Sequence, residues 1–459
     1  MSTTEDLPLF LRGNWAPLSE ERTLTDLRVT GNIPAELDGR YVRNGANPLT
    51  GYADHPFLGD GMIHGIRLRD GKAEWYRNRY VATPFIAHPD QAAIDLDSSL
   101  TDMTASKANT NIIGHAGRLL ALEEGHFPYV LDGGLKTVGP HDFGGALKGS
   151  FTAHPKVCPV TGELLAFGYS LFEPYLTYLR VSANGELAQV ENITVGGPTM
   201  MHDFNVTSNY IIFMDLPAVF DIDMAMRGEM PIHWSDSYPA RLGVMPRIGN
   251  DADVTWYDID PCYVFHSMNA YEDGNSIVID VARLDHIWRD SPMDFPAPAL
   301  HRWTIDTSAG SVRQEQVDDL PAEFPRVADS VVGLEHRYGY MMANATESAF
   351  EEPLSAAGAI LKYDRTTGER SQIDVGMGRL PGETVFVPSA NGVAEDDGYL
   401  MTYVYDAASH ESDFMIFDAS SMSAEPVATV HLPRVPFGFH GNWVAVHTPN
   451  RKTSARPNS

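Results

Sequence analysis

Short apolar runs separated by two-residue turns fill most of this chain, and they restrict its possible folds more than any other property. The runs are rich in Val, Ile, Leu, Tyr and Phe and recur from residue 39 onward. Glycine adopts the positive φ that tight hairpins require. A two-residue turn that ends in glycine and lies between two apolar runs therefore indicates a hairpin. No sustained helical periodicity lies between them, which predicts an all-β chain. The clearest turn pairs are Asp70-Gly71, Thr161-Gly162, Asn184-Gly185, Asp273-Gly274 and Thr367-Gly368.

The number and spacing of these hairpins favour a propeller. About eight hairpins are too many for a two-sheet sandwich, and their spacing is too irregular for an array of constant period. A β-propeller with insertions at 82–109 and 217–254 fits better, and 223–234 is the best helical candidate. No shift in composition marks a second domain. We therefore expect an irregular N-terminal arm packed on the body over 1–35, a single propeller domain over 36–447 and a flexible tail over 448–459.

Charge and cysteine content exclude several classes of protein. The chain has 61 acidic residues against 33 Lys and Arg, a formal net charge of −28. That field repels phosphate backbones and anionic bilayers, so we expect no nucleic-acid partner and at most a peripheral membrane contact. The two cysteines form no CxxC motif, which fits a reducing compartment. Neither a signal peptide nor an apolar run of about 20 residues is evident, so we expect a cytoplasmic protein.

Four histidines lie in apolar surroundings within or beside predicted strands: His154, His202, His266 and His440. Their wide spacing excludes a local zinc motif. A buried histidine is usually satisfied by a backbone carbonyl, and several of the 17 histidines lie beside strands, so apolar surroundings alone decide nothing. In a propeller, however, the inner strand ends of different blades meet at one axis. One neutral histidine from each of four blades could then bind a single metal ion there.

Six segments of the chain resemble the carotenoid cleavage oxygenases, the family of carotenoid dioxygenases, lignostilbene dioxygenases and the vertebrate retinoid isomerase. The resemblance runs from about Asp38 to Val444. The segments are Gly39-Arg-Tyr-Val-Arg-Asn-Gly-Ala-Asn-Pro48, Gly59-Asp-Gly-Met-Ile-His64, Thr152-Ala-His-Pro155, Met201-His-Asp-Phe204, Phe265-His-Ser-Met-Asn269 and Phe437-Gly-Phe-His-Gly441.

The resemblance implies a seven-bladed propeller whose axis holds one Fe(II) beneath a roof of loops and short helices. It implies that His154, His202, His266 and His440 bind the iron and serve in catalysis. It also implies three carboxylates that orient the imidazoles, because a neutral histidine can donate its free N–H to a carboxylate, which fixes its tautomer and orientation. These are Glu124, Glu323 and Glu383.

The implied reaction is cleavage of a conjugated C=C bond by O2, which gives two carbonyl products. An electron-rich alkene can supply the electrons itself, and no motif for a 2-oxo acid cosubstrate is visible. Four imidazoles are one more protein ligand than the two-His, one-carboxylate sites have. They would therefore leave two adjacent positions open on an octahedral ion. The protein must then hold one double bond of an apolar conjugated substrate in a mostly apolar tunnel.

Residues near the insertions and motifs are candidates for the tunnel wall, although each residue type is more often found in a core. We predict substrate contacts for Phe57, Phe85, Phe127, Phe204, Met268 and Phe439, with Leu58 and Tyr129 beside them.

One departure from the family bears on the substrate. Relatives that cleave lignostilbene carry a lysine, paired with a tyrosine, directly before the glutamate that matches Glu124, and they bind the substrate phenol as phenolate. This chain has Glu123 there, and a carboxylate repels a phenolate. We therefore expect a carotenoid or apocarotenoid; Lys107 and Tyr80 are the other candidates for binding a phenolate. The alternatives are cleavage of a stilbene or phenylpropenoid, a non-oxidative ester isomerase, and a non-catalytic scaffold that binds no metal.

Overall fold

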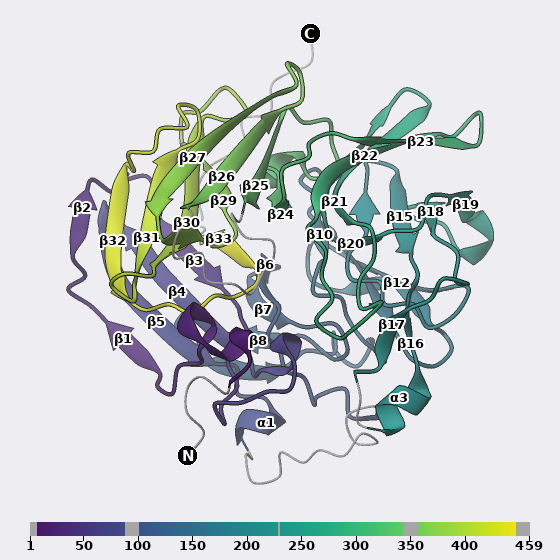
Figure 1. Ribbon diagram of the computed structural model, residues 1–459, viewed down its shortest axis with the longest axis horizontal. Helices are drawn as coiled ribbons and strands as arrows, with labels where there is room; N and C mark the ends of the chain where they lie inside the picture. Colours follow the sequence, from purple (N-terminus) through teal and green to yellow (C-terminus); the bar gives the residue numbers. More distant parts are fainter. Residues whose placement is uncertain (1–6, 88–100, 228–229, 344–356, 447–459) are drawn as a thin grey trace.

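Seven β-sheet blades surround a central axis in the computed structural model, which describes residues 7–87, 101–227, 230–343 and 357–446 (Figure 1). The blades follow one another around the ring in chain order, and each is an antiparallel sheet of four or more strands. The prediction of an all-β, seven-bladed propeller is confirmed. The tail predicted over 448–459 lies outside the described residues.

The first blade closes the ring, because it combines strands from both ends of the chain. Its innermost strand comes from the C-terminal region and pairs with β3 from Gly39↔Ala445 to Arg43↔Gly441. The strands, in order across the sheet, are β33 (Gly441–Ala445), β3 (Gly39–Arg43), β4 (Met62–Arg69), β5 (Lys72–Tyr80) and β1 (Arg22–Leu24).

The next three blades are four-stranded meanders, and the fourth carries a separate hairpin. In the second blade the strands are β6 (Asn111–His115), β7 (Arg118–Leu122), β8 (Tyr129–Leu131) and β9 (Thr137–Pro140); in the third β10 (Lys156–Val157), β11 (Leu164–Tyr169), β12 (Leu176–Val181) and β13 (Leu187–Ile193). In the fourth they are β14 (Asn205–Val206), β15 (Tyr210–Asp215), β18 (Arg241–Pro246) and β19 (Thr255–Asp258), with the hairpin β16 (Ala218–Phe220) and β17 (Ile232–Trp234).

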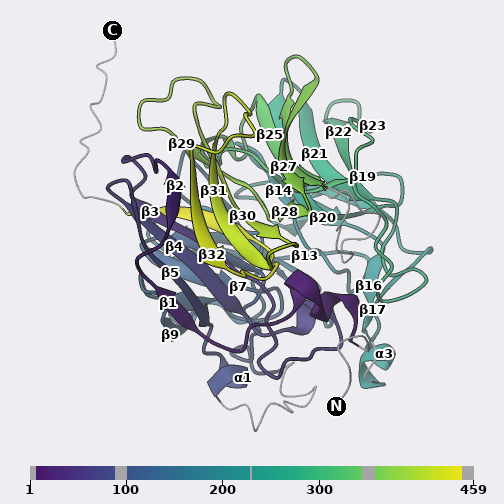
Figure 2. The ribbon, with the colours of Figure 1, turned by 60° about the vertical axis from the view of Figure 1, so that its left-hand side comes forward.

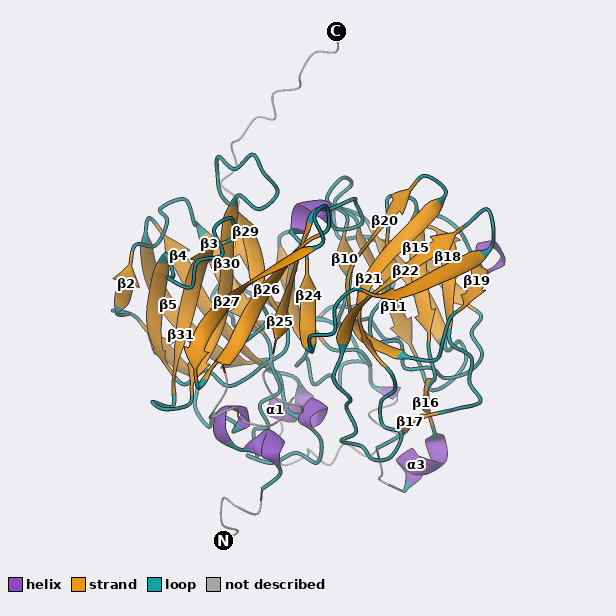
Figure 3. Ribbon diagram, turned by 45° about the horizontal axis from the view of Figure 1, so that its top comes forward, coloured by secondary structure: helices purple, strands orange, loops and turns teal. Residues whose placement is uncertain are grey.

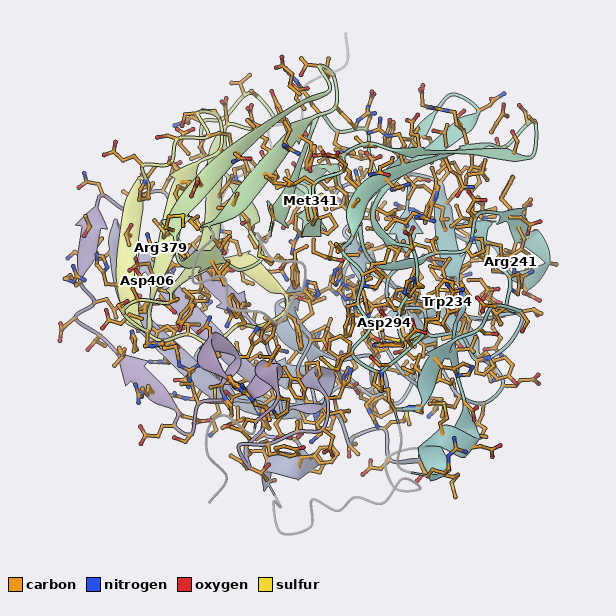
Figure 4. The ribbon with its side chains drawn as sticks, in the orientation of Figure 1. Trp234, Arg241, Asp294, Met341, Arg379 and Asp406 are labelled. Atoms are coloured by element: carbon orange, nitrogen blue, oxygen red, sulfur yellow. The ribbon has the colours of Figure 1, made fainter. Side chains whose placement is uncertain are left out.

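The last three blades complete the ring. In the fifth the strands are β20 (Tyr263–Asp273), β21 (Ser276–Leu284), β22 (Ala299–Asp306) and β23 (Ser311–Gln316); in the sixth β24 (Ala322–Arg326), β25 (Tyr338–Ala343), β26 (Ala357–Asp364) and β27 (Glu369–Met377). In the seventh they are β28 (Arg379–Pro381), β29 (Val385–Pro388), β30 (Gly398–Asp406), β31 (Glu411–Asp418), β32 (Ala428–Pro433) and β2 (Val29–Gly31). In this blade Arg379 begins β28 and Asp406 ends β30. The Arg379 Nε and Asp406 Oδ2 atoms lie 3.8 Å apart (Figure 4).

The innermost strands of the blades lie around the axis, where β14 contacts β20, β20 contacts β24, and β33 contacts β6 and β29. Strands in the middle of a blade are covered by neighbouring blades on both faces and therefore read as continuous apolar runs, as β11 does. The outer strand β13 alternates instead between exposed and partly buried residues, because only one of its faces is covered.

The hydrophobic core is divided among the contacts between blades. Ile212 and Leu242 of the fourth blade share one buried cluster with Ile279 and Trp303 of the fifth, and the Trp303 side chain is completely buried. Neighbouring blades therefore stabilise one another through apolar burial, and the inner strand ends are fixed relative to the axis.

Short helices gather on one side of the strands and form the predicted roof (Figure 3). Helix α3 begins where Asp221 caps it, since this side chain accepts hydrogen bonds from Asp223 N at 2.8 Å and Met224 N at 3.2 Å. The helices of this side are α1 (Pro84–Ala87), α3 (Ile222–Met226) and the 3-10 helices η2 (Leu9–Leu11) and η3 (Gly13–Trp15). The other 3-10 helices are η4 (Pro56–Leu58), η6 (Asp251–Asp253) and η7 (Asp329–Val331).

Two expectations about local structure need correction. The arm is not irregular throughout, because β1 pairs with β5 and β2 with β32, each adding an edge strand to a blade (Figure 2). An open sheet edge leaves unpaired backbone groups that such a strand satisfies. The helix expected over 223–234 is shorter, since α3 ends at Met226 and β17 begins at Ile232. In the described part of the chain, no helix has the length and apolarity to span a bilayer.

Candidate metal centre

The four predicted histidines converge on one point near the axis. His154 lies in the loop before β10, His202 shortly before β14, His266 within β20, and His440 directly before β33. One ligand nitrogen from each ring lies within 4.8 Å of the others, and the Nε2 atoms of His202 and His266 are 3.3 Å apart. Residues from four blades thus form one group that could hold a metal ion.

Each of three imidazoles has a carboxylate at its Nδ1 atom. Glu323 Oε2 lies 2.6 Å from His266 Nδ1, and Glu383 Oε1 lies 3.0 Å from His440 Nδ1. Glu124 Oε1 pairs in the same way with His202 Nδ1. A carboxylate at Nδ1 places the proton there and leaves the lone pair on Nε2 for the centre of the group. The three glutamates predicted from the resemblance therefore lie where they would orient these rings.

His154 differs, because no carboxylate lies against its ring among the described residues. Its ring centroid is 4.5 Å from that of His202, 4.5 Å from that of His440 and 5.1 Å from that of His266. Its Nε2 atom is buried and has no hydrogen-bond partner in the described part of the chain. A buried nitrogen without a partner is costly, and coordination to a cation would satisfy it. The donor set therefore fits a metal that accepts imidazole ligands, such as iron, zinc, copper or nickel.

The electrostatics of the site favour the neutral form of two of the four rings. Burial lowers the pKa of His154 well below its ordinary value, and the neighbouring imidazoles lower it further. Burial lowers the pKa of His440 to about 4, although Glu383 acts in the opposite direction. Burial of Glu383 opposes its ionisation, but Arg326 and His440 hold its pKa down at about 2. At neutral pH these two rings are uncharged and this carboxylate is charged, as metal binding requires.

Two further residues donate hydrogen bonds to the other carboxylates, the Tyr169 hydroxyl to Glu124 and the Phe324 backbone N–H to Glu323. Tyr169, the last residue of β11, donates its hydroxyl to Glu124 Oε2 at 2.5 Å. Phe324 has a φ of 52°, in the left-handed region that few residues other than glycine adopt. Phe324 directly follows Glu323, and its ring stacks on that of His266, with the two centroids 5.2 Å apart. Burial lowers the pKa of His266, and Glu323 more than offsets this, so the net shift is upward.

The histidine group opens into a largely apolar cavity of about 840 Å³, within the size range of small-molecule sites. Phe57 is part of an aromatic wall, and its ring centroid lies 5.8 Å from that of Phe439, 6.2 Å from that of Phe265 and 6.4 Å from that of Trp288. The rings of His202, His266 and His440 form part of the wall. A ligand in the cavity would therefore meet both aromatic faces and edges and the rings of the histidine group.

The match to known proteins covers the same part of the chain as this architecture. The family model described as retinal pigment epithelial membrane protein matches residues 15–445. The carotenoid cleavage oxygenase of Mycobacterium tuberculosis is 41% identical, over 95% of this chain and 97% of that protein. The chain belongs to the carotenoid cleavage oxygenase family.

Solved structures agree with this assignment. The lignostilbene dioxygenase of Pseudomonas brassicacearum has a TM-score of 0.86 and 28% identity, covering 96% of this chain and 99% of that chain. The cobalt-substituted apocarotenoid oxygenase of Synechocystis has a TM-score of 0.84 and 28% identity, covering 95% and 98%. The resemblance found in the sequence is confirmed, and the protein is an oxygenase of this family.

Within this carotenoid cleavage oxygenase fold, only some of the predicted substrate contacts line the cavity. Phe57, Phe439 and Leu58 do. Phe204 packs at 5.0 Å against Phe167 in a buried cluster, and Met268 is buried against another. These two are packing residues, because their side chains point between blades and not toward the axis.

Three other predicted residues also lie outside the cavity. Phe85 in α1 carries the Lys107 ammonium 3.9 Å from its ring centroid. Phe127 packs against the core cluster between the second and third blades, and Tyr129 is a buried residue of β8. None of the three is part of the cavity wall, so the structure gives them packing roles in place of the predicted substrate contacts.

Several wall residues were not predicted from the sequence. Phe265 directly precedes a predicted ligand, as Phe439 does. This position next to a ligand is the feature of the sequence that could have identified it as a wall residue. Trp288 and Phe295 lie in the loop between β21 and β22, whose sequence gives no sign that it reaches the cavity. These rings contact Phe57 and make the cavity more aromatic than expected.

Proposed function

We propose that the protein is a non-haem Fe(II)-dependent dioxygenase that cleaves one conjugated C=C bond of a carotenoid or apocarotenoid with O2. The products are two carbonyl compounds, one oxygen atom in each. The observation that carries the proposal is the group of four imidazoles, three of them buried and three of them backed by carboxylates, in the wall of an apolar aromatic cavity.

Fe(II), when bound, would supply the redox chemistry that allows O2 to react with an alkene. The protein's part is to hold His154, His202, His266 and His440 as neutral ligands. Glu124, Glu323 and Glu383 keep the Nδ1 proton in place on three rings, and their charges offset part of that of the cation. Four imidazoles place no charged ligand on the ion.

The cavity would select and align the substrate. A conjugated hydrocarbon chain is flat and apolar, and the rings of Phe57, Phe265 and Trp288 provide faces and edges against which it can pack. A double bond held in this way beside the histidine group would react in a fixed geometry and away from bulk water.

Glu123 supports a carotenoid over a phenolic stilbene. It lines the cavity, and its carboxylate accepts hydrogen bonds from the backbone N–H of Glu124 at 2.9 Å and Gly125 at 3.1 Å and pairs with His126. Burial opposes its ionisation, but His126 and these N–H groups lower its pKa below the ordinary value. An anion fixed in the wall would repel a phenolate.

The two other candidates for binding a phenolate do not line the cavity. Lys107 Nζ pairs with Asp60 Oδ1 at 2.8 Å. The Tyr80 hydroxyl accepts a hydrogen bond of 2.5 Å from Asn47 Nδ2. The lignostilbene dioxygenase of Pseudomonas brassicacearum shares the fold, so cleavage of a stilbene or phenylpropenoid is the second candidate function.

The direct test is to remove bound metal, load the protein with Fe(II) without oxygen, and then incubate it in air with three substrates. These are β-apo-8′-carotenal, a full-length carotenoid and resveratrol. We expect Fe(II)-dependent loss of carotenoid or apocarotenoid absorbance and an aldehyde product identified by mass spectrometry. Cleavage of resveratrol alone would replace the leading proposal with the second one. Cleavage without iron, or none with it, would contradict both.

Replacing the Glu123 charge should change substrate preference. In Glu123→Gln, the amide oxygen can still accept the backbone hydrogen bonds, but the repulsion of a phenolate is lost. We expect kcat/KM for resveratrol to rise about tenfold relative to that for β-apo-8′-carotenal. Glu173→Gln is the matched control, because Glu173 also lines the cavity but is exposed, so water screens its charge. An unchanged ratio in Glu123→Gln would remove the electrostatic argument for substrate choice.

Phe57→Ala tests the aromatic wall. The variant loses ring contacts with Phe265, Trp288 and Phe439, and we expect kcat/KM for the preferred substrate to fall about tenfold with normal iron content. Phe127→Ala removes a partly buried ring outside the cavity and should leave the kinetics unchanged. Steady-state rates and iron analysis check both variants; a Phe57→Ala enzyme with wild-type kinetics would show that substrate does not use this wall.

A further inference from the structure

The residues that flank the four histidines are connected to one another across blades. Asp203 directly follows His202, and its side chain is almost completely buried. Its Oδ1 atom lies 2.8 Å from Lys156 Nζ, two residues after His154. Its Oδ2 atom accepts a 2.9 Å hydrogen bond from the backbone N–H of Ser267, which directly follows His266. One carboxylate thus joins the chain segments of three histidines.

A second set of contacts connects the fourth histidine to the others. Arg326 lies in β24, three residues after Glu323, and donates to Gly441 O at 3.1 Å and to Asn442 Oδ1 at 2.9 Å, next to His440. Asn442 Nδ2 donates in turn to Asn111 Oδ1 at 3.2 Å. Asn111 Nδ2 donates to the carbonyl of Ala153, the residue before His154, at 2.8 Å.

Together these contacts form a closed polar belt around the axis. The belt runs through Ala153, Lys156, Asp203, Ser267, then through the His266–Glu323 pair to Arg326, and back through Asn442 and Asn111. It therefore connects inner strands or loops of the first six blades. Glu383 attaches the seventh, because its Oε2 atom accepts the Gly441 N–H at 2.7 Å and its Oε1 atom lies 3.3 Å from Arg326 Nη1.

Three of the four ligand segments need such a connection, because His154, His202 and His440 lie in loops before strands and not within them. Their rings present lone pairs toward one point, an arrangement that apolar packing does not favour by itself. A metal site works only when its ligands are held within about 0.5 Å of the binding geometry by surrounding contacts. Charge-assisted hydrogen bonds such as those of Asp203 are the strongest available for this purpose.

We infer that Asp203 is a positioning residue for the metal centre: its carboxylate, shared between Lys156 and the Ser267 amide, holds three histidine segments at the spacing at which one ion binds. The inference rests on the proposed metal site and adds a residue that touches neither metal nor substrate.

The test is a Co²⁺ titration of the metal-free full-length protein, followed by visible absorption, together with the thermal midpoint of the metal-free form. Asp203→Asn is compared with Asp280→Asn, which breaks the Asp280–Arg302 pair in the fifth blade. The two pairs are matched, since the side-chain exposed fractions are 2% and 20% for Asp203 and Lys156 and 2% and 19% for Asp280 and Arg302.

We expect both variants to lower the thermal midpoint, but only Asp203→Asn to raise the Kd for Co²⁺, by about 10- to 100-fold, and to alter the absorption bands. Lys156→Gln should raise the Kd by a smaller factor. An unchanged Kd and spectrum in Asp203→Asn, or an equal rise in Asp280→Asn, would overturn the inference. If Asp203→Asn does not fold, an unchanged Kd in Lys156→Gln overturns it. Failure of the wild-type protein to bind Co²⁺ would instead refute the proposed metal site.

Discussion

His202→Ala is expected to abolish both iron binding and alkene cleavage. The variant removes one of four converging nitrogens and leaves Glu124 buried without the ring against which it lies. Three imidazoles cannot reproduce the geometry, and a buried carboxylate without its partner disfavours the folded site further. We expect less than about one hundredth of wild-type turnover and an iron content near zero. Metal analysis after anaerobic Fe(II) loading and a carotenoid cleavage assay measure both quantities.

The control for this prediction is His115→Ala. His115 is as buried as His202, both 8% exposed, and its Nε2 atom lies 3.0 Å from the Gly162 carbonyl, away from the group. Its loss should lower stability but leave iron content and turnover unchanged. The same loss of iron is expected for alanine at His154, His266 or His440. An iron-replete, active His202→Ala enzyme would contradict the ligand assignment.

The blades could be predicted because hairpins are local. Asp70-Gly71 lies between two apolar runs, and the structure forms β4 and β5 on either side of it. Gly71 has a φ of 72°, which a residue with a side chain rarely adopts. The closure of the ring was not predictable in the same way, because β33 pairs with β3 across almost the whole chain. No local pattern specifies such a partner.

The histidine group could be proposed from the sequence only by assuming the fold. His266 lies in a strand pattern and His440 in a glycine-rich loop, and nothing in either segment refers to the other. Their rings lie 4.6 Å apart between centroids because two blades bring their inner strands to one axis. The positions of Glu124 and Glu383 came from the family resemblance, since a lone glutamate beside a strand carries no signal of its own.

The cavity wall was predicted least well, for a geometrical reason. Phe204 and Met268 each lie two positions after a ligand, and the strict alternation of an extended strand would place them on the same face as that ligand. The alternation is broken at both places, because Phe204 lies in the loop before β14 and the register of β20 shifts between Val264 and Asn269, so both side chains are buried between blades. Trp288 and Phe295 reach the cavity from a loop, whose course depends on tertiary contacts.

The second large effect is expected at Glu383. This carboxylate is the most buried of the three, with 2% of its side chain exposed against 11% for Glu124 and 21% for Glu323. It accepts a hydrogen bond from the Gly441 amide and pairs with both His440 and Arg326. We expect Glu383→Gln to weaken iron binding about 100-fold, and Glu323→Gln about tenfold. Chelator competition against the reloaded enzymes measures both.

Glu383→Gln is expected to weaken iron binding more than Glu323→Gln because the two substitutions differ in which neighbouring groups lose a charged partner. In Glu323→Gln the more exposed site admits water, which can take the place of the lost charge beside His266. In Glu383→Gln the partly buried Arg326 guanidinium loses the shorter of its two ion pairs and keeps only that with the exposed Asp329, at 3.6 Å. An amide can also turn its NH2 group toward His440, which reverses the tautomer and directs N–H toward the metal position. Asp396→Asn is the matched control, because it breaks the buried Asp396–Lys362 pair, which joins the seventh blade to the sixth without contact to the histidines, and should leave iron affinity unchanged. Equal losses of affinity in Glu383→Gln and Glu323→Gln would show that burial and Arg326 do not set the importance of these carboxylates.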